Sequence, residues 1–207
     1  MEEKLKKLIM VGIMALAIFI AQPPISCNSE SNQDNTVLTS LPTSLYNHSG
    51  KKALTPSEAK TVAVHVIDRL PHIEDKLNYK KLVQETASAE TDFGEFKLRP
   101  KIKGMYQIHI QSAKEILDVC KKVHPEGYQA VMAFYDYGRS FAHNLHHNIL
   151  FGTAVCATYY KFRMSKSADI STVRQRGLQW LKVYATSKGG GSMPYWLKKS
   201  KQTETVS

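Results

Sequence analysis

The chain has 207 residues, 43% of them hydrophobic, which suits one folded domain of ordinary size. Its 28 Lys and Arg residues exceed its 18 Asp and Glu residues, giving a formal net charge of +10. Such an excess suits an anionic partner, such as nucleic acid, a phospholipid surface or an acidic cell-wall polymer, and it also fits a basic surface without a special partner. Because no RNA- or DNA-reading motif is present, we do not expect nucleic-acid binding.

The N-terminus has the features of an export signal. A lysine-bearing start precedes an uninterrupted apolar run from Leu8 to Ala21, which is short for a membrane span but fits a signal-peptide core. The following PPISCN resembles a lipoprotein signal, with Cys27 as the lipidation site, although Pro24 stands where that pattern has Leu, Val or Ile. We expect residues 1–26 to be a signal peptide or an uncleaved signal anchor. Both alternatives predict an envelope location, periplasmic or on the outer face of a membrane, with possible anchoring through the N-terminus.

Residues 27–53 are rich in Ser, Asn and Thr and lack an apolar period, so we expect a flexible linker. Two further cysteines, Cys120 and Cys156, lie on apolar helical stripes. They could form a disulfide in an oxidising compartment, but packing as small hydrophobic residues is the preferred interpretation.

A mostly α domain is expected over residues 54–192, followed by a basic tail at 193–207. Capping boxes at Thr55/Glu58 and Ser112/Glu115 predict two helix starts, and Pro125 suits a third. Residues 106–110 are the one candidate strand. The expected helices cover residues 55–70, 78–91, from 112, 125–137, 144–162 and 171–187.

One carboxylate lies on the apolar face expected for the second helix. At about 100° per residue, Glu90 falls on the stripe that begins at Leu82 and Val83, whereas Glu85 and Asp92 fall elsewhere, mostly on the far side. A buried carboxylate has a raised pKa and can serve as a general acid. The alternative is a helix-end glutamate that points to water.

Four motifs after this glutamate appear in an order that resembles the lytic transglycosylases of the soluble Slt type, which belong to the goose-type-lysozyme-like superfamily. In that family a helix ends in a catalytic Glu, a Gly-Leu-Met-Gln-Ile segment precedes the next helix, and an Asn-Ile…Gly…Tyr helix and an Ala-Tyr-Asn-Ala-Gly-Pro segment follow. The matching positions are Glu90-Thr91, Gly104 to Ile108 with Ser112-Ala113, Asn148-Ile149 with Gly152 and Tyr160, and Trp180 to Gly189.

This resemblance implies a lysozyme-like α domain that cleaves the β-1,4 bond between N-acetylmuramic acid and N-acetylglucosamine in peptidoglycan. Glu90 would be the single acid/base, and the product would be a 1,6-anhydro sugar. The substrate would contact five further residues, Gln107, Tyr184, Tyr106, Gly104 and Asn148. For Gln107 and Tyr184 the alternatives are a loop amide that satisfies its own turn and a tyrosine packed in a helical core.

Two other functions remain open at this point. A lysozyme would hydrolyse the same bond with a second carboxylate, for which Asp92 is the candidate. A catalytically weak wall-binding or scaffold protein is favoured by departures from the family pattern, since Ala185 replaces the Asn and Ser187-Lys188-Gly189 replaces the Gly-Pro.

The remaining features carry weaker signals. His143, His146 and His147 recur near one-turn spacing, but no further ligand is obvious, so we expect no metal and no cofactor. The aromatic and lysine residues of the C-terminal tail could contact the wall or a membrane, or could simply be solvated. We expect a monomer, which could be phage-encoded, whose partner is the peptidoglycan glycan strand.

Overall fold

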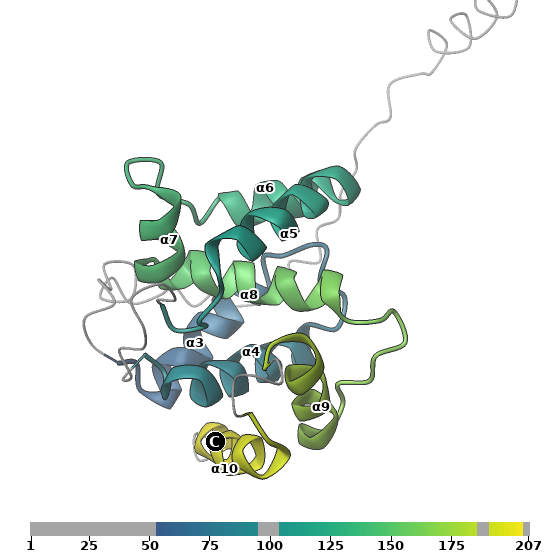
Figure 1. The fold of residues 1–207 in the computed structure, drawn as a ribbon. Coiled ribbons are helices and arrows are strands. Elements are labelled where there is room, and N and C mark those ends of the chain that lie inside the picture. Colours follow the sequence, from purple (N-terminus) through teal and green to yellow (C-terminus); the bar gives the residue numbers. More distant parts are fainter. Residues whose placement is uncertain (1–52, 95–103, 186–190, 205–207) are drawn as a thin grey trace, which may run out of the picture. The chain divides into compact units, whose positions relative to one another are not determined.

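The structure is a computed structural model that describes residues 53–94, 104–185 and 191–204, all within one compact unit spanning residues 39–207. These ranges contain eight helices and no strand (Figure 1), which confirms the mostly α class for the described part of the chain. The export signal, Cys27 and the linker up to residue 52 lie outside the described residues. Among the described helices, none has the length and apolar character needed to cross a bilayer.

The first helix begins where its local signal predicts. The Thr55 hydroxyl accepts a hydrogen bond from the backbone N–H of Glu58, and the Glu58 carboxylate accepts one from the backbone N–H of Thr55, which completes the capping box. The helices are, in chain order, α3 (Pro56–Ile67), α4 (Lys76–Thr91), α5 (Ile110–Val123), α6 (Pro125–Met132), α7 (Phe141–His147), α8 (Ile149–Arg163), α9 (Val173–Val183) and α10 (Met193–Glu204).

Helix α8 forms the centre of the unit. It is buried along nearly its whole length, and it contacts α3 and α4 on one side and α5, α6 and α7 on the other (Figure 1). A helix that is apolar all round is expected in such a position. Cys156 of α8 and Cys120 of α5 are buried free thiols, which confirms the expected packing role.

Three expectations about element boundaries were wrong. Residues 106–110 do not form a strand: Tyr106 ends a turn, residues 107–109 are irregular, and Ile110 begins α5, which is capped by His109 instead of Ser112. The long helix expected at 144–162 is two helices that meet at Asn148, whose extended backbone ends α7 and whose side chain caps α8.

The expected C-terminal tail is instead a helix packed onto the domain. Helix α10 contacts α4 and α9, and its Trp196 is fully buried. The side chain of Trp196 donates to the Val173 carbonyl at 3.1 Å, which ties α10 to the start of α9. The folded unit therefore extends to at least Glu204.

Candidate active site

Glu90 lies in the last turn of α4, where the chain changes direction sharply. The three residues after the helix end at Thr91, namely Asp92, Phe93 and Gly94, all have positive φ, with values of 48°, 59° and 98°. The N–H of Phe93 bonds back to the Ala87 carbonyl at 3.1 Å, which satisfies an acceptor at the helix end. The helix therefore ends at Thr91, one residue after Glu90, and the Glu90 side chain stands at a helix terminus.

The carboxyl group of Glu90 is largely buried and accepts one hydrogen bond from a neutral donor. Trp180 Nε1 of α9 donates to Glu90 Oε1 at 2.8 Å. Burial raises the pKa of Glu90 to about 7, and the hydrogen bond from Trp180 opposes this shift. Near neutral pH the protonated and ionised forms coexist, so the group can both donate and accept a proton.

An aromatic wall lies near this carboxyl group. The charge of Glu90 contributes to raising the pKa values of Tyr160, Tyr184 and Cys156, all of which are raised mainly by burial. The rings of Tyr160 and Tyr184 stack at 5.3 Å, and the Tyr184 hydroxyl lies 3.7 Å from Cys156 Sγ. The structure thus brings Tyr184 into the neighbourhood of Glu90, with its hydroxyl directed to the thiol.

The segment from Gly104 to Ile108 is joined to the end of α4. Thr91 Oγ1 donates to the Met105 carbonyl at 2.8 Å, and Gln107 Nε2 donates to the Gly104 carbonyl at 2.7 Å. Gly104 has φ 90°, and a Cβ there would lie 3.0 Å from the backbone of His146, so only glycine fits. The amide of Gln107 therefore satisfies the carbonyl of its own turn. The same turn is bonded to Thr91, the residue that follows Glu90.

Tyr106 and Asn148, also expected to contact substrate, bond to the protein itself. The buried hydroxyl of Tyr106 lies 3.0 Å from Thr153 Oγ1. Asn148 accepts from the Phe151 backbone at 3.1 Å and donates to the Phe134 carbonyl at 2.7 Å. Their contact with a substrate stays a prediction.

Sequence reasoning left Glu85 off the one face of α4 that was expected to be buried, but Glu85 is buried too. Glu85 is 3% exposed and forms a bidentate pair with Arg176 of α9, with distances of 2.8 Å to Nε and 2.6 Å to Nη2. Burial raises the pKa of Glu85, and the guanidinium opposes that effect. Asp92 pairs with Lys199 of α10, so its carboxylate is engaged there and not with Glu90.

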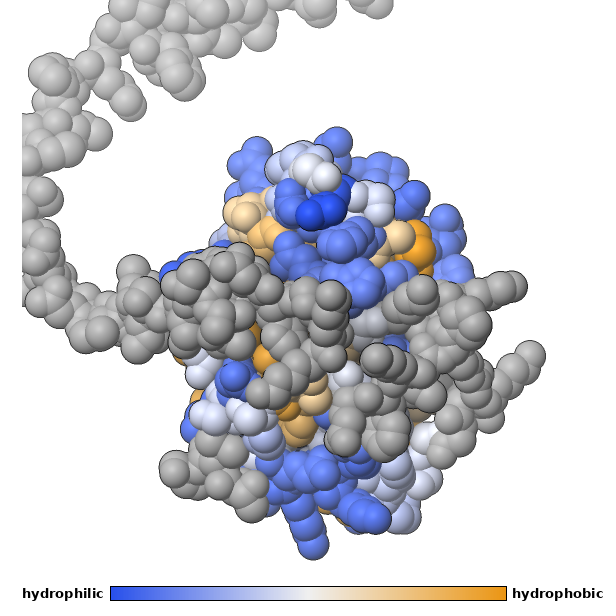
Figure 2. Space-filling model, turned by 90° about the vertical axis from the view of Figure 1, so that its left-hand side faces the viewer, coloured by the Kyte–Doolittle hydropathy of each residue, from blue (hydrophilic) through white to orange (hydrophobic). Residues whose placement is uncertain are grey.

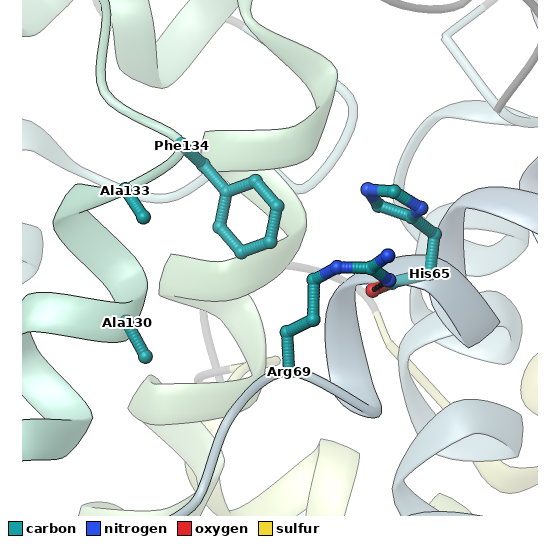
Figure 3. Close-up of a pocket in the computed structure, with 5 residues that line it drawn as sticks. All are labelled: His65, Arg69, Ala130, Ala133 and Phe134. Carbon is teal, nitrogen blue, oxygen red and sulfur yellow. Dashed lines mark hydrogen bonds between the residues drawn. The ribbon is translucent and has the colours of Figure 1, made fainter. Parts of the chain in front are cut away.

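Two other places in the fold have some features of a binding site. The rings of His143 and His147 are 4.9 Å apart, but the described residues contain no group of three or more His, Cys, Asp or Glu side chains that could hold a metal ion. A pocket of about 330 Å³ lies between α3 and α6 (Figure 3). None of the residues expected to contact substrate lines it; its walls are His65, Arg69, Ala130, Ala133 and Phe134.

Comparison with known proteins adds no assignment, because no family model, curated protein or solved structure matches this chain. The surface gives only a general indication of polarity. On the face drawn in Figure 2, hydrophilic residues cover much of the described surface and leave small apolar patches between them.

Proposed function

We propose that this chain is a peptidoglycan lytic transglycosylase with a lysozyme-like α domain and Glu90 as its single acid/base. The observation that carries the proposal is the state of this carboxyl group, which is largely buried, faces one neutral donor and has a pKa of about 7. A general acid that works near neutral pH needs a carboxyl group of this kind. The order of the motifs around Glu90 in the sequence supports the same reaction.

In the proposed reaction, protonated Glu90 donates its proton to the glycosidic oxygen as the bond from that oxygen to C1 of the muramic acid breaks. The acetamido group of the substrate stabilises the positive charge at C1. The carboxylate of Glu90 then removes the proton of the 6-hydroxyl, whose oxygen bonds to C1 to give the 1,6-anhydro sugar. The carboxyl group ends in its starting form, and no water is consumed.

This route is favoured over hydrolysis with two carboxylates. A hydrolase of that kind needs a second Asp or Glu across the bond from the acid. The candidate from the sequence, Asp92, forms an ion pair with Lys199, and Glu85 is held by Arg176. Each of these carboxylates already has a cationic partner within the protein.

A wall-binding protein with little turnover is the second candidate. It is favoured by the bonds that Gln107, Tyr106 and Asn148 make within the protein, since three of the expected substrate contacts are engaged elsewhere. Both candidates place the chain at the cell envelope, anchored or released there, as a monomer on glycan strands. The formal charge of +10 suits such an anionic polymer.

The test is digestion of purified peptidoglycan by the full chain, with the products identified by mass spectrometry. Wild type should release anhydro-muropeptides, which are lighter by one water than hydrolysed ends. Glu90→Gln should be slower by about 100-fold or more, the usual contribution of a general acid. Glu126→Gln is the matched control, because Glu126 is exposed on α6, and it should retain the wild-type rate.

Each outcome assigns the function. Equal rates for wild type and Glu90→Gln would contradict the role of Glu90, and products that carry the extra water would show a hydrolase. Binding to peptidoglycan without release of any product would select the wall-binding protein.

A further inference from the structure

The side chain that contacts Glu90 is itself held by the C-terminal helix. Trp180 is 3% exposed, and its indole stacks on Tyr195 at 6.2 Å and packs against Trp196 at 5.1 Å. Both of these aromatic residues belong to α10. A Cβ at Gly191 would lie 2.7 Å from the Trp180 ring, so the chain entering α10 also confines the indole.

Helix α10 is in turn fastened to the last turns of α4. The Tyr195 hydroxyl donates to the Ala89 carbonyl at 2.8 Å, one residue before Glu90. The Ser88 hydroxyl lies 3.0 Å from the Lys199 carbonyl, and Lys199 pairs with Asp92. These contacts bracket Glu90 on both sides along α4.

Helix α10 also approaches α9 closely. A Cβ at Gly177 would lie 2.6 Å from Trp196 Cδ1 and 2.9 Å from Met193 Sδ, so the absence of a side chain on α9 permits this approach. The indole of Trp180 is thus packed among α9, α10 and Gly191, and its N–H donates to Glu90.

We infer that Trp180 is a positioning residue for Glu90 and that α10, by fixing its indole, is part of the catalytic centre. The inference rests on the proposed function. Because Oε1 accepts the indole N–H, it acts as the carbonyl oxygen of the protonated acid, and the proton is carried by Oε2. After the proton has left, the same N–H stabilises the carboxylate. Trp180 therefore determines which oxygen delivers the proton and makes its release easier.

The direct test compares Trp180→Phe with Trp196→Phe. Each variant keeps an aromatic ring and removes one indole N–H, but Trp180 donates to Glu90, whereas Trp196 donates to the Val173 carbonyl. The titration of Glu90 would be followed by carboxyl ¹³C NMR, with its signal assigned by its loss in Glu90→Gln. Trp180→Phe should raise the pKa of Glu90 above its wild-type value. Trp196→Phe keeps the donor to Glu90 and loosens only its support in α10, so it should lower the melting temperature and move that pKa less.

Turnover gives a second measurement on the same proteins. Trp180→Phe should reduce kcat by about tenfold or more with a smaller change in KM, since a hydrogen bond to a charged group is lost in the reacting state. The alkaline limb of the pH–rate profile should move to higher pH together with the pKa of Glu90. A merely structural tryptophan would lower the melting temperature and leave this limb in place.

The outcomes separate the inference from the proposed function, because the NMR titration needs no substrate. An unchanged or lowered Glu90 pKa in Trp180→Phe, or an equal shift in Trp196→Phe, would overturn the positioning role. A raised pKa in Trp180→Phe, with no cleavage of peptidoglycan by wild type, would support the contact and overturn the proposed function.

Discussion

Two glutamates of α4 form side-chain contacts with α9, and the two contacts differ in how well they stabilise an ionised carboxylate. At one point Glu85 meets Arg176, a permanent cation that binds both carboxylate oxygens. At the other, one turn further along α9, Glu90 meets Trp180, which offers one uncharged N–H to one oxygen. Both glutamates lose water on folding, but only Glu85 gains a charge in compensation.

The difference shows how one helix pair can hold a charge-paired acid and an acid without a charged partner, which we propose is the reactive one, little more than one turn apart. A buried ion pair with bidentate geometry stabilises the ionised form of Glu85 and links the two helices. A single neutral donor compensates burial only in part, so the pKa of Glu90 rises to about 7. The identity of the partner on α9, not the degree of burial alone, separates the two roles.

Breaking the ion pair should have the largest effect. Arg176→Met leaves Glu85 buried without its cation and also removes a hydrogen bond to the Ile170 carbonyl. We expect the free energy of unfolding at pH 7, measured in urea, to fall by about 3–5 kcal/mol. The loss should be smaller at pH 5, where Glu85 can take up a proton.

The double variant Glu85→Gln/Arg176→Met is the control for this experiment. It removes the charge as well as its partner, and it should recover part of the lost stability. A single variant that costs less than about 1 kcal/mol would show that Glu85 is not a structural ion-pair partner.

The second prediction concerns the uncompensated acid. Folding raises the pKa of Glu90 from 4.5 to about 7, so the native state binds its proton more tightly than the unfolded state. Between these two pH values stability must fall as pH rises, by about 3 kcal/mol in total. Glu90→Gln cannot titrate, and its glutamine oxygen can still accept from Trp180. The variant should match wild type near pH 4, below the unfolded pKa, and be more stable by up to about 3 kcal/mol at pH 8.

Urea unfolding at several pH values measures this difference, with Glu126→Gln as the exposed control. Parallel stability profiles for wild type and Glu90→Gln would mean that Glu90 titrates normally in the folded protein. Such a result would remove the contrast between the two glutamates.

The sequence predicts well the features that depend on neighbouring residues. The capping box of Thr55 and Glu58 defines the start of α3, since both partners lie within one turn. A similar pattern at Ser112 and Glu115 misplaces the start of α5, because the helix already begins at Ile110. There Glu115 accepts from Gln111 along the helix instead of closing a cap.

The error about Glu85 has a different origin. A helical-wheel argument assumes one buried face, whereas residues 82–89 of α4 are all buried. Helices α3 and α8 cover part of this surface, and α10, which the sequence suggested was a solvated tail, covers another part. The partners Arg176 and Trp180 could not be identified either, because their pairing with α4 depends on how α9 and α10 pack.

A third prediction tests the support behind Trp180. Gly177→Ala places a methyl group 2.6 Å from the Trp196 ring, which cannot be relieved by a side-chain rotation alone. The gain of about 1 kcal/mol in helix propensity should be outweighed by overpacking of about 1–3 kcal/mol, leaving a net loss of about 1 kcal/mol. The Glu90 pKa should shift as α10 moves.

Gly152→Ala is the matched control in α8, where a Cβ would find its nearest neighbour at 3.4 Å, an ordinary contact. This variant should be as stable as wild type or slightly more stable. If Gly177→Ala behaves in the same way, the close approach of α10 to α9 does not constrain the site.

The smallest effect is expected at the ion pair of Asp92, the C-cap residue of α4, with Lys199 of α10. Asp92 and Lys199 are 15% and 14% exposed, between the buried Glu85 pair and a fully solvated one. Lys199→Met should lower the free energy of unfolding by about 1 kcal/mol or less, because partial solvent screening weakens the pair. Raising the salt concentration should destabilise wild type more than the variant. Lys161 pairs with Glu74, which is 85% exposed, so Lys161→Met should change the free energy of unfolding still less. A larger loss for Lys161→Met than for Lys199→Met would mean that burial does not determine the strength of these ion pairs.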